Sequence, residues 1–230
     1  MYKGKKIVCI IPTRGGSKGL PGKNIKMFSD KPLIAHTIEQ AKRSGLIDRV
    51  IVSTDDQKIA TISKKYGAEV PFIRPFFLAQ DKSSTMDVLL HAADWLKKNG
   101  YLFDVLVLLH ATAPLRTPED INKSIKLLFS KNVSNVFSVT QAHRNPYFNM
   151  VETRRARIRL VKESRFASRQ QAPKVYDMNA SIYVWWNDVL MKNKKIFLKN
   201  SRLYIMPKER SIDIDDELDF RIAEFLKENH

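Results

Sequence analysis

Cysteine is nearly absent from this chain, and no apolar run is long enough to cross a membrane. The 230 residues include a single cysteine, Cys9, so an internal disulfide is excluded and a reducing compartment is indicated. Cys9 lies in an apolar run, where a buried structural thiol is expected rather than a catalytic one. The longest apolar runs, such as Val105–Leu109, are far shorter than the roughly 20 residues of a membrane-spanning helix. We therefore expect a cytoplasmic protein with no membrane partner.

Acidic residues are outnumbered by basic ones, which gives a formal net charge of +16. Such a balance attracts nucleic acid, anionic membranes or phosphorylated small molecules. No nucleic-acid-binding module accompanies the charge, so nucleic acid is not expected as a partner, and a basic nucleic-acid-binding protein is the alternative from another class. One local concentration is interpreted as a solvated face, and it consists of Arg154, Arg155, Arg157, Arg159, Lys162, Arg165 and Arg169.

Short β-rich runs alternate with amphipathic stretches along most of the chain. The pattern predicts strands at 6–12, 50–54, 105–110, 135–140, 181–186 and 203–206. It predicts helices at 33–44, 58–66, 85–99, 118–130 (capped by Thr117) and 218–228. Alternation at this spacing indicates an α/β fold with a doubly wound, Rossmann-like, mostly parallel sheet.

The alternation breaks between residues 142 and 172, where an Asn-Pro turn and mixed polarity favour a hairpin. We expect a single domain over residues 1–230 with an inserted arm at about 142–172. In the following strand, Trp185 and Trp186 have strand spacing, so one of them is expected in the core.

A glycine-rich segment with three cations, PTRGGSKGLPGKN at residues 12–24, follows the first predicted strand. In an open α/β sheet, ligands bind at the carboxyl ends of the strands, where this loop must lie. The segment matches neither G-x-G-x-x-G nor the ATP P-loop spacing. Its glycines allow backbone N–H groups to converge on an anion, and its cations can neutralise a triphosphate. The residues concerned are Arg14, Gly15, Gly16, Lys18, Gly19 and Lys23.

Near the C-terminus, SIDIDDELD at residues 211–219 places two carboxylates on one face of an extended segment. These are Asp213 and Asp215, and the two intervening isoleucines are expected to face the core. Oxygen ligands in this arrangement suit Mg²⁺. The following Asp216 and Glu217 are expected to cap the terminal helix and complement its dipole.

These segments resemble those of nucleotide-sugar cytidylyltransferases, specifically the CMP-sialic acid synthetase family with its CMP-legionaminic and CMP-pseudaminic acid synthetases. The resemblance covers nearly the whole chain through RGGSKGLPGKN, KPLIAHTI, VIVSTDD, LAQDKSST, APLRT, SRQQAP, MNASIY and SIDIDDELD. It implies Mg²⁺-dependent transfer of CMP from CTP to a nine-carbon acidic sugar, with release of pyrophosphate. Catalysis would come from alignment and charge neutralisation by Arg14, Lys23, Asp213 and Asp215.

By this resemblance the nucleotide site includes the glycine loop and two further segments. Asn24 would position the nucleotide, and Ser83 or Ser84 would lie near the cytosine. His110 replaces a glutamine of the family, and both a ligand contact and a structural role stay open for it. The CTP phosphates would be contacted by Arg14, Gly15, Ser17, Lys18 and Lys23.

The sugar side carries the departures from the family pattern. Arg169 is the candidate partner of the sugar carboxylate, and Gln170, Gln171 and Asn179 would read its hydroxyls or amide. Where the sialic-acid enzymes have a lysine, this chain has an aromatic segment beginning at Tyr147. This difference favours nonulosonic acids in general, such as legionaminic acid, over N-acetylneuraminate in particular. A cytidylyltransferase for 3-deoxy-octulosonate is the nearer alternative, although the RQQ and SIDID motifs lean away from it.

Members of the family are dimers in which an arm reaches the neighbouring sugar site. The irregular segment at 142–172 would be that arm, and Arg165 and Arg169 could serve the pocket of either subunit.

Overall fold

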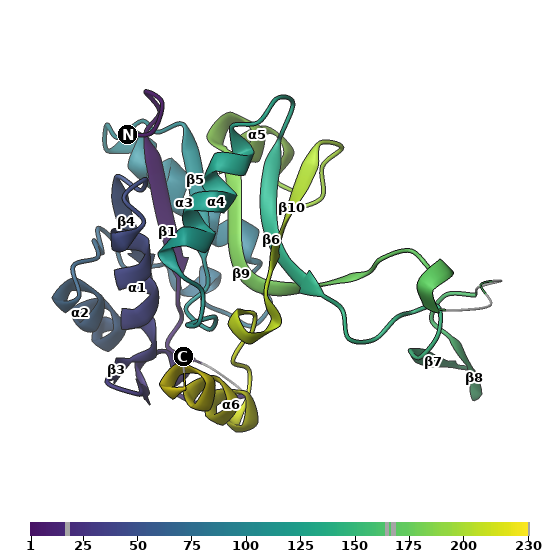
Figure 1. The fold of residues 1–230 in the computed structure, drawn as a ribbon. Helices are drawn as coiled ribbons and strands as arrows, with labels where there is room; N and C mark the ends of the chain where they lie inside the picture. Colours follow the sequence, from purple (N-terminus) through teal and green to yellow (C-terminus); the bar gives the residue numbers. More distant parts are fainter. Residues whose placement is uncertain (17–18, 164–165, 167–168, 230) are drawn as a thin grey trace.

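The computed structural model describes residues 1–16, 19–163, 166 and 169–229, and it is built on one six-stranded sheet (Figure 1). The strand order is β10-β6-β9-β5-β1-β4. Five strands run in the same direction, and β9 (Tyr176–Trp186) is antiparallel to both of its neighbours. The prediction of a mostly parallel sheet is confirmed by β1 (Ile7–Pro12), β4 (Arg49–Ser53), β5 (Val105–Leu109), β6 (Asn135–Gln141) and β10 (Ser201–Met206).

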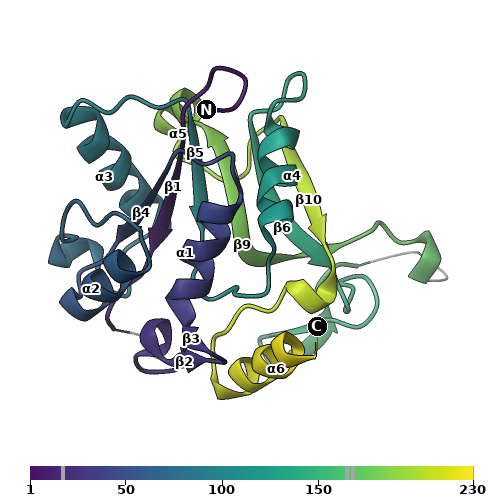
Figure 2. The same cartoon turned by 60° about the vertical axis from the view of Figure 1, so that its left-hand side comes forward.

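Helices cover both faces of this sheet. One face packs against α1 (Leu33–Arg43), α2 (Gln57–Lys65) and α4 (Pro118–Leu128), and Figure 2 shows α1 and α4 side by side on it. The other face packs against α3 (Thr85–Lys98) and α5 (Asn187–Asn193). Because both faces are covered, β1 is apolar at successive positions. Cys9 is fully buried in this strand, and burial raises the pKa of its thiol far above the ordinary value, which confirms the structural role.

Local signals fix most of the helix starts. Thr117 caps α4 in a reciprocal box with Asp120, as its sequence predicts. Ser84 caps α3 and Asp56 caps α2 through side-chain acceptors. The structure differs from the prediction in that β9 begins at Tyr176 instead of residue 181, and α5 was not predicted.

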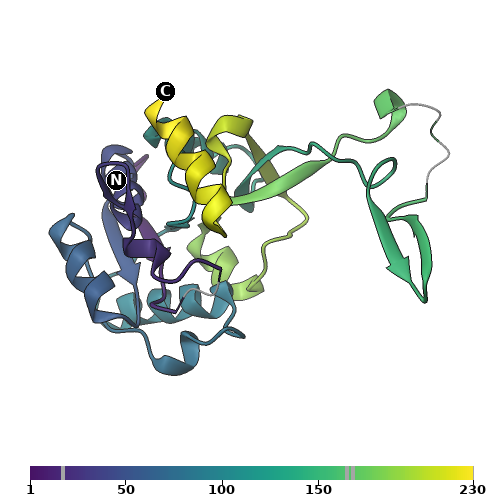
Figure 3. The same ribbon diagram turned by 90° about the horizontal axis from the view of Figure 1, so that it is seen from below.

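The terminal helix α6 (Glu217–Glu228) packs over the small hairpin of β2 (Met27–Phe28) and β3 (Lys31–Pro32), which follows the short helix η1 (Lys23–Ile25). Figure 3 shows α6 across the lower end of the body. Asp216 caps α6, as expected. The segment before it is pinned because Ile214 is fully buried and Ile212 packs on the same cluster. This segment lies at the carboxyl edge of the sheet, since Ile214 N–H donates to the carbonyl of Thr112, just beyond β5.

Between β6 and β9 the chain leaves the body as a long arm (Figures 1 and 3). The arm carries the antiparallel hairpin of β7 (Val151–Arg154) and β8 (Arg157–Leu160), so the predicted hairpin is confirmed. Its turn residues Arg155 and Ala156 both have positive φ, 51° and 62°, as a two-residue hairpin turn requires. The short helix η3 (Arg169–Gln171) follows before the chain returns to the sheet.

Candidate active site

The glycine loop and the carboxylate segment, almost 200 residues apart in sequence, lie against each other at the carboxyl edge of the sheet. They border a cleft of about 430 Å³. A cleft of this size fits the range of small-molecule sites. Its lining comes from the ends of β1 and β5, the glycine loop and the carboxylate segment: Pro12, Thr13, Arg14, Gly19, Lys23, Asn24, His110, Ala111, Thr112 and Asp215.

Two contacts join the loop to the carboxylate segment. A Cβ at Gly19 would lie 2.3 Å from the carbonyl oxygen of Asp215, so only glycine permits this approach. The Lys23 ammonium donates to the carbonyl of Ile214 at 2.7 Å and lies 3.3 Å from a carboxylate oxygen of Asp215. The Lys23 side chain is largely buried, whereas that of Asp215 is 80% exposed. The site therefore presents a fixed cation beside an accessible carboxylate.

The loop is also tied to the edge of the sheet. Asn24 donates from its amide to the carbonyl of Arg14 at 3.1 Å, so it holds the loop conformation. Gly15 N–H donates to Asp55 at 3.1 Å, and a Cβ at Gly15 would lie 2.8 Å from the Asp56 carboxylate. The Arg14 guanidinium pairs with Asp81 at 2.8 Å across the mouth of the cleft. Ser17 and Lys18, two predicted phosphate contacts, lie outside the described residues.

Asp213 and Asp215 differ in environment, since Asp213 is partly buried and Asp215 is exposed. Asp213 is largely withdrawn from solvent, and one of its carboxylate oxygens is buried with no hydrogen-bond partner. Burial raises the pKa of Asp213, the Thr112 hydroxyl opposes part of this shift, and the charge of Asp215 adds to it. A buried, unpartnered carboxylate oxygen beside an exposed carboxylate is a fitting pair for a hard cation. Among the described residues no cluster of three or more His, Cys, Asp or Glu side chains forms a complete metal cage.

His110 lies at the end of β5, and its ring packs edge-on against Tyr183 with centroids 5.9 Å apart. Burial lowers the pKa of His110 to about 4, with smaller contributions from Arg116 and Lys23, so the imidazole is neutral at pH 7. The residue thus both lines the cleft and packs against the sheet.

Arg116 is a buried cation behind the cleft that the sequence did not mark as functional. Its guanidinium donates to the carbonyls of His110 and Ser181, to Thr37 at 2.6 Å and to Gln40 at 3.1 Å. It therefore joins the end of β5 and the middle of β9 to α1. The APLRT motif contains this residue, but an arginine that serves only main-chain and neutral partners leaves no pattern in the sequence.

Neither Ser83 nor Ser84 lines the main cleft, and Ser83 borders a separate hollow. Ser83 lines a cleft of about 500 Å³ with Phe77, Leu78 and His91, and its hydroxyl donates to the carbonyl of Phe77 at 2.8 Å. The hydroxyl of Ser84 is engaged in the cap of α3. Of the two serines, Ser83 is the better placed to face a ligand.

The predicted sugar residues are dispersed along β9 and the arm. Asn179 is buried in β9, where its oxygen accepts from Ser138 at 2.7 Å and its amide nitrogen donates to Ser211 at 3.0 Å. A sugar contact would require Asn179 to give up one of these bonds, so its geometry favours a structural role. Tyr147 packs edge-on with Phe166 at 5.6 Å between ring centroids.

Gln170 and Gln171 are exposed on η3. Gln170 borders a hollow of about 520 Å³ at the base of the arm, with Asn145 and Lys174. The side chain of Arg169 and the whole of Arg165 lie outside the described part of the chain, so the predicted carboxylate partner is not placed.

The comparisons with known proteins agree with this arrangement. A family model described as cytidylyltransferase matches residues 8–230, which include the glycine loop, the cleft and the carboxylate segment. The chain belongs to the cytidylyltransferase family. It is therefore a nucleotidyltransferase with the mostly parallel α/β fold of that family, and the predicted resemblance is confirmed.

Relatives within the cytidylyltransferase family are similar over almost their whole length. The chain is 43% identical to the CMP-N,N'-diacetyllegionaminic acid synthase of Campylobacter jejuni, covering 96% of this chain and 94% of the relative. It is 42% identical, with the same coverage, to the flagellin modification protein B of Campylobacter coli. The structure of CMP:2-keto-3-deoxy-manno-octonic acid synthetase complexed with CTP shares the fold, with a TM-score of 0.72, 19% identity and coverage of 97% of this chain and 99% of that one.

Proposed function

We propose that this cytidylyltransferase activates a nonulosonic acid with CTP to give the CMP-sugar and pyrophosphate. The observation that carries the proposal is the contact between Gly19 and Asp215, which brings the cationic loop against the carboxylate segment. A triphosphate needs neutralising cations, and a bound divalent metal needs oxygen ligands within reach of the same phosphates. Both requirements are met within one cleft.

The chain's own residues act by binding and alignment. Arg14 exchanges Asp81 for the phosphates of CTP, while Lys23 is held in place by the carbonyl of Ile214. The anomeric hydroxyl of the sugar attacks the α-phosphorus in line, the bond to the bridging oxygen breaks, and pyrophosphate leaves toward Arg14 and Lys23. His110 stays neutral at pH 7, so it can line the nucleotide cleft without adding a charge.

Asp213 and Asp215 fit Mg²⁺, because Asp213 has a buried oxygen without a protein partner. Mg²⁺ is usually held by one or two carboxylates, with waters and substrate phosphates completing its coordination, so a larger protein cage is not required. When bound, the ion supplies charge neutralisation at the phosphates and polarises the attacking hydroxyl. Asp213 and Asp215 then fix its position against the sheet.

The acceptor is proposed to be of the legionaminic type. Support comes from the relative at 43% identity that is named for diacetyllegionaminic acid. The octulosonate enzyme is only 19% identical, so its similarity supports the fold and not the acceptor. The N-acylneuraminate cytidylyltransferase of Escherichia coli is 33% identical. Contacts of the sugar with Tyr147, Arg169, Gln170 and Gln171 belong to this proposal.

A homodimer with the arm as its contact is part of the same proposal. In β7 and β8, Val151 pairs with Leu160 and Thr153 with Ile158, so these four side chains share one face of the hairpin. Val151 and Ile158 are 64% and 74% exposed. An isolated two-stranded hairpin is marginally stable in water, and cover from a second subunit would stabilise it.

A cytoplasmic location also remains a prediction.

The deciding experiment measures pyrophosphate release from CTP and Mg²⁺ with separate acceptors. The panel consists of legionaminic, pseudaminic, N-acetylneuraminic and 3-deoxy-octulosonic acids. Fastest release with legionaminic acid supports the proposal, preference for the octulosonate favours the alternative, and no release with any acceptor contradicts it.

A matched pair of variants tests the metal assignment. Asp215→Ala should lower kcat by about 1,000-fold or more, because charge neutralisation at the phosphates is lost. Asp188→Ala removes an exposed carboxylate from α5 and should leave turnover unchanged. Retained activity in Asp215→Ala would reject the assignment.

A further inference from the structure

The positive charge of the molecule is not gathered at the active site. The carboxyl edge of the sheet, where the cleft lies, also carries several acidic residues, including Asp55, Asp81, Asp215 and Glu217. The excess of cations lies instead on the arm and at the opposite, amino edge of the strands. Attraction of CTP therefore does not account for the basic surface at the amino edge.

The amino edge is formed by the segments that enter the parallel strands and by the segment that leaves β9. Exposed lysines occur in each of them: Lys3, Lys5 and Lys6 before β1, Lys97 and Lys98 before β5, Lys131 before β6, and Lys192, Lys194, Lys195 and Lys199 between β9 and β10. Complementing helix dipoles explains those at the ends of α3 and α5. It does not explain Lys3, Lys5, Lys6, Lys131 or Lys199, which lie outside helices.

Most of these lysines are not committed to carboxylates. Lys5 pairs with Asp104 at 2.8 Å and Lys98 with Asp94 at 2.8 Å. Within the described part of the chain no ion pair is formed by Lys97, Lys131, Lys192, Lys194 or Lys195. This edge of the body therefore carries a surplus of uncompensated charge.

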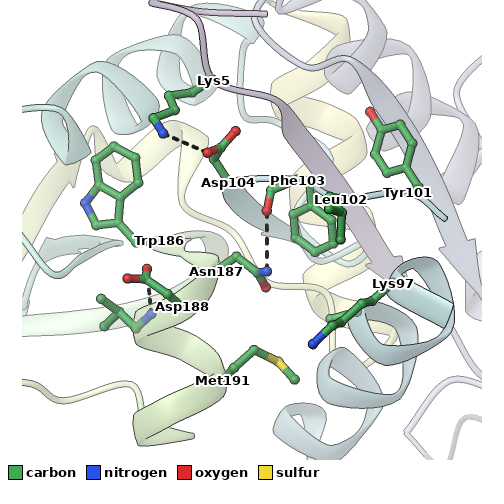
Figure 4. Close-up of a pocket in the computed structure, with 12 residues that line it drawn as sticks. Lys5, Lys97, Tyr101, Leu102, Phe103, Asp104, Trp186, Asn187, Asp188 and Met191 are labelled. Carbon is green, nitrogen blue, oxygen red and sulfur yellow. Dashed lines mark hydrogen bonds and ion pairs between the residues drawn. The ribbon is translucent and has the colours of Figure 1, made fainter.

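Apolar side chains stand among the lysines. Leu102 is 65% exposed in the turn before β5, and Phe197 is 69% exposed in the turn before β10. Between α3 and α5 lies a cleft of about 740 Å³, and Figure 4 shows Lys5 and Lys97 on two of its sides with Leu102, Phe103 and Trp186. Two acids line this cleft: Asp104 is paired with Lys5 and accepts from the backbone N–H of Lys6, and Asp188 at the start of α5 accepts from the backbone N–H of Val189.

We propose that this amino edge is a docking surface for an anionic lipid bilayer. Lysines are attracted to acidic headgroups, and protruding Leu102 and Phe197 enter the interface between headgroups and acyl chains. The sequence predicts no membrane partner, because its apolar runs are too short to span a bilayer, and no helix among the described residues is long and apolar enough to cross one. Peripheral binding needs no such helix. The active-site cleft lies at the opposite, carboxyl edge of the strands.

Other occupants fit the edge less well. A second copy docked through the same face would bring like charges together, because a two-fold interface places each patch on itself. Nucleic acid would pair with the lysines but would leave Leu102 and Phe197 against phosphates. A bilayer accommodates both the cations and the apolar side chains.

The test is sedimentation of the full chain with vesicles. One set is phosphatidylcholine alone and the other is phosphatidylglycerol and phosphatidylcholine in equal parts. The triple variant Lys97→Glu, Lys192→Glu, Lys195→Glu reverses three exposed charges at the amino edge. The control variant Lys58→Glu, Lys208→Glu, Lys227→Glu makes the same change in net charge on exposed lysines elsewhere. Pyrophosphate release checks that both variants are folded.

The parent protein should bind the anionic vesicles and not the neutral ones. Binding should fall by about 100-fold or more in the amino-edge variant, because each of the three lysines near the surface contributes about fivefold and the variant also introduces repulsion. The control variant should bind nearly as the parent does. Equal losses of vesicle binding in the two variants would mean that binding depends only on the net charge of the protein, and this would overturn the proposal. So would absence of binding to anionic vesicles, or binding of duplex DNA through the same lysines in preference to vesicles.

Discussion

Single residues in the glycine loop offer the sharpest contrast. A Cβ at Gly19 would lie 2.3 Å from the Asp215 carbonyl, whereas one at Gly16 would meet nothing within 4 Å. Gly19→Ala must push the loop away from the carboxylate segment, and kcat/KM for CTP should fall about 100-fold, as for a misplacement of about 1 Å. Gly16→Ala adds the same methyl group to the loop without a clash with the protein, so its loss of activity should be clearly the smaller of the two. Equal activities of the two variants in a pyrophosphate assay would mean that the contact is dispensable.

His110 should make stability depend on pH. Its pKa is lowered by burial to about 4, below the ordinary value near 6.5, so the unfolded chain binds the proton more tightly. The neutral, buried imidazole therefore costs no stability above pH 6.5. As the pH falls from 6.5 toward 4, the unfolding free energy decreases, and the loss amounts to about 2 kcal/mol by pH 5. Urea titrations of His110→Gln between pH 7.5 and 5 should show a flatter profile than the parent. Parallel profiles would contradict the buried environment.

Site residues could be predicted where the pattern that indicates their role lies within one short segment of the sequence. Glycines and cations after a strand, or alternating aspartates, indicate an anion site and a metal site whatever lies far away in sequence. Arg116 and Asn179 could not be assigned in this way, because their roles depend on partners such as Thr37 and Ser138 that only the fold brings near. A polar residue in a motif looks the same whether it binds a ligand or a neighbouring strand.

Among the elements, the turn before the carboxylate segment depends on one buried acid. Asp120 of α4 accepts from Arg210 of η4 (Lys208–Arg210) at 2.8 and 3.0 Å and from Tyr204 of β10 at 2.8 Å. Burial opposes ionisation of this carboxyl, but these hydrogen bonds outweigh it and lower the pKa of Asp120. Arg210 thereby fixes the start of the segment that leads to Asp213.

Asp120→Asn should therefore loosen the carboxylate segment without touching it. We expect a loss of about 2 kcal/mol in unfolding free energy, less than for a fully buried pair because Arg210 is a third exposed. The Mg²⁺ concentration that gives half-maximal turnover should also rise. Glu209→Gln, an exposed neighbour, is the control. A stability loss with an unchanged Mg²⁺ dependence would mean that the contacts of Asp120 with Arg210 and Tyr204 do not position the carboxylate segment.

The elements that sequence patterns missed share a physical cause. The first half of β9 contains Ala180 with a positive φ of 43°, at an irregularity where Ser138 bonds both Ile182 N–H and Asn179. This irregularity breaks the alternation on which strand prediction depends. The antiparallel direction of β9 follows from how the arm returns the chain to the sheet, and no local periodicity encodes that.

At the scale of the whole molecule, the arm presents an apolar hairpin face that is exposed within the described part of the chain. Val151 and Ile158 lie on the same face of the hairpin, while Arg154 and Arg157 lie on the other. If a second subunit covers the apolar face, Val151→Asp with Ile158→Asp should raise the dimer dissociation constant at least about 30-fold, since buried anchors of an interface each contribute about 2 kcal/mol. Sedimentation equilibrium measures this change, and Arg157→Gln on the opposite face is the control.

The same variant separates assembly from nucleotide binding. CTP is held by the glycine loop and the carboxylate segment within one body, so KM for CTP should stay close to the parent value. KM for the sugar should rise, because the arm would no longer reach the partner's acceptor site. A parent protein that is monomeric and fully active would remove the role of the arm in assembly, yet it would leave the cleft between Gly19 and Asp215 as the site of CMP transfer.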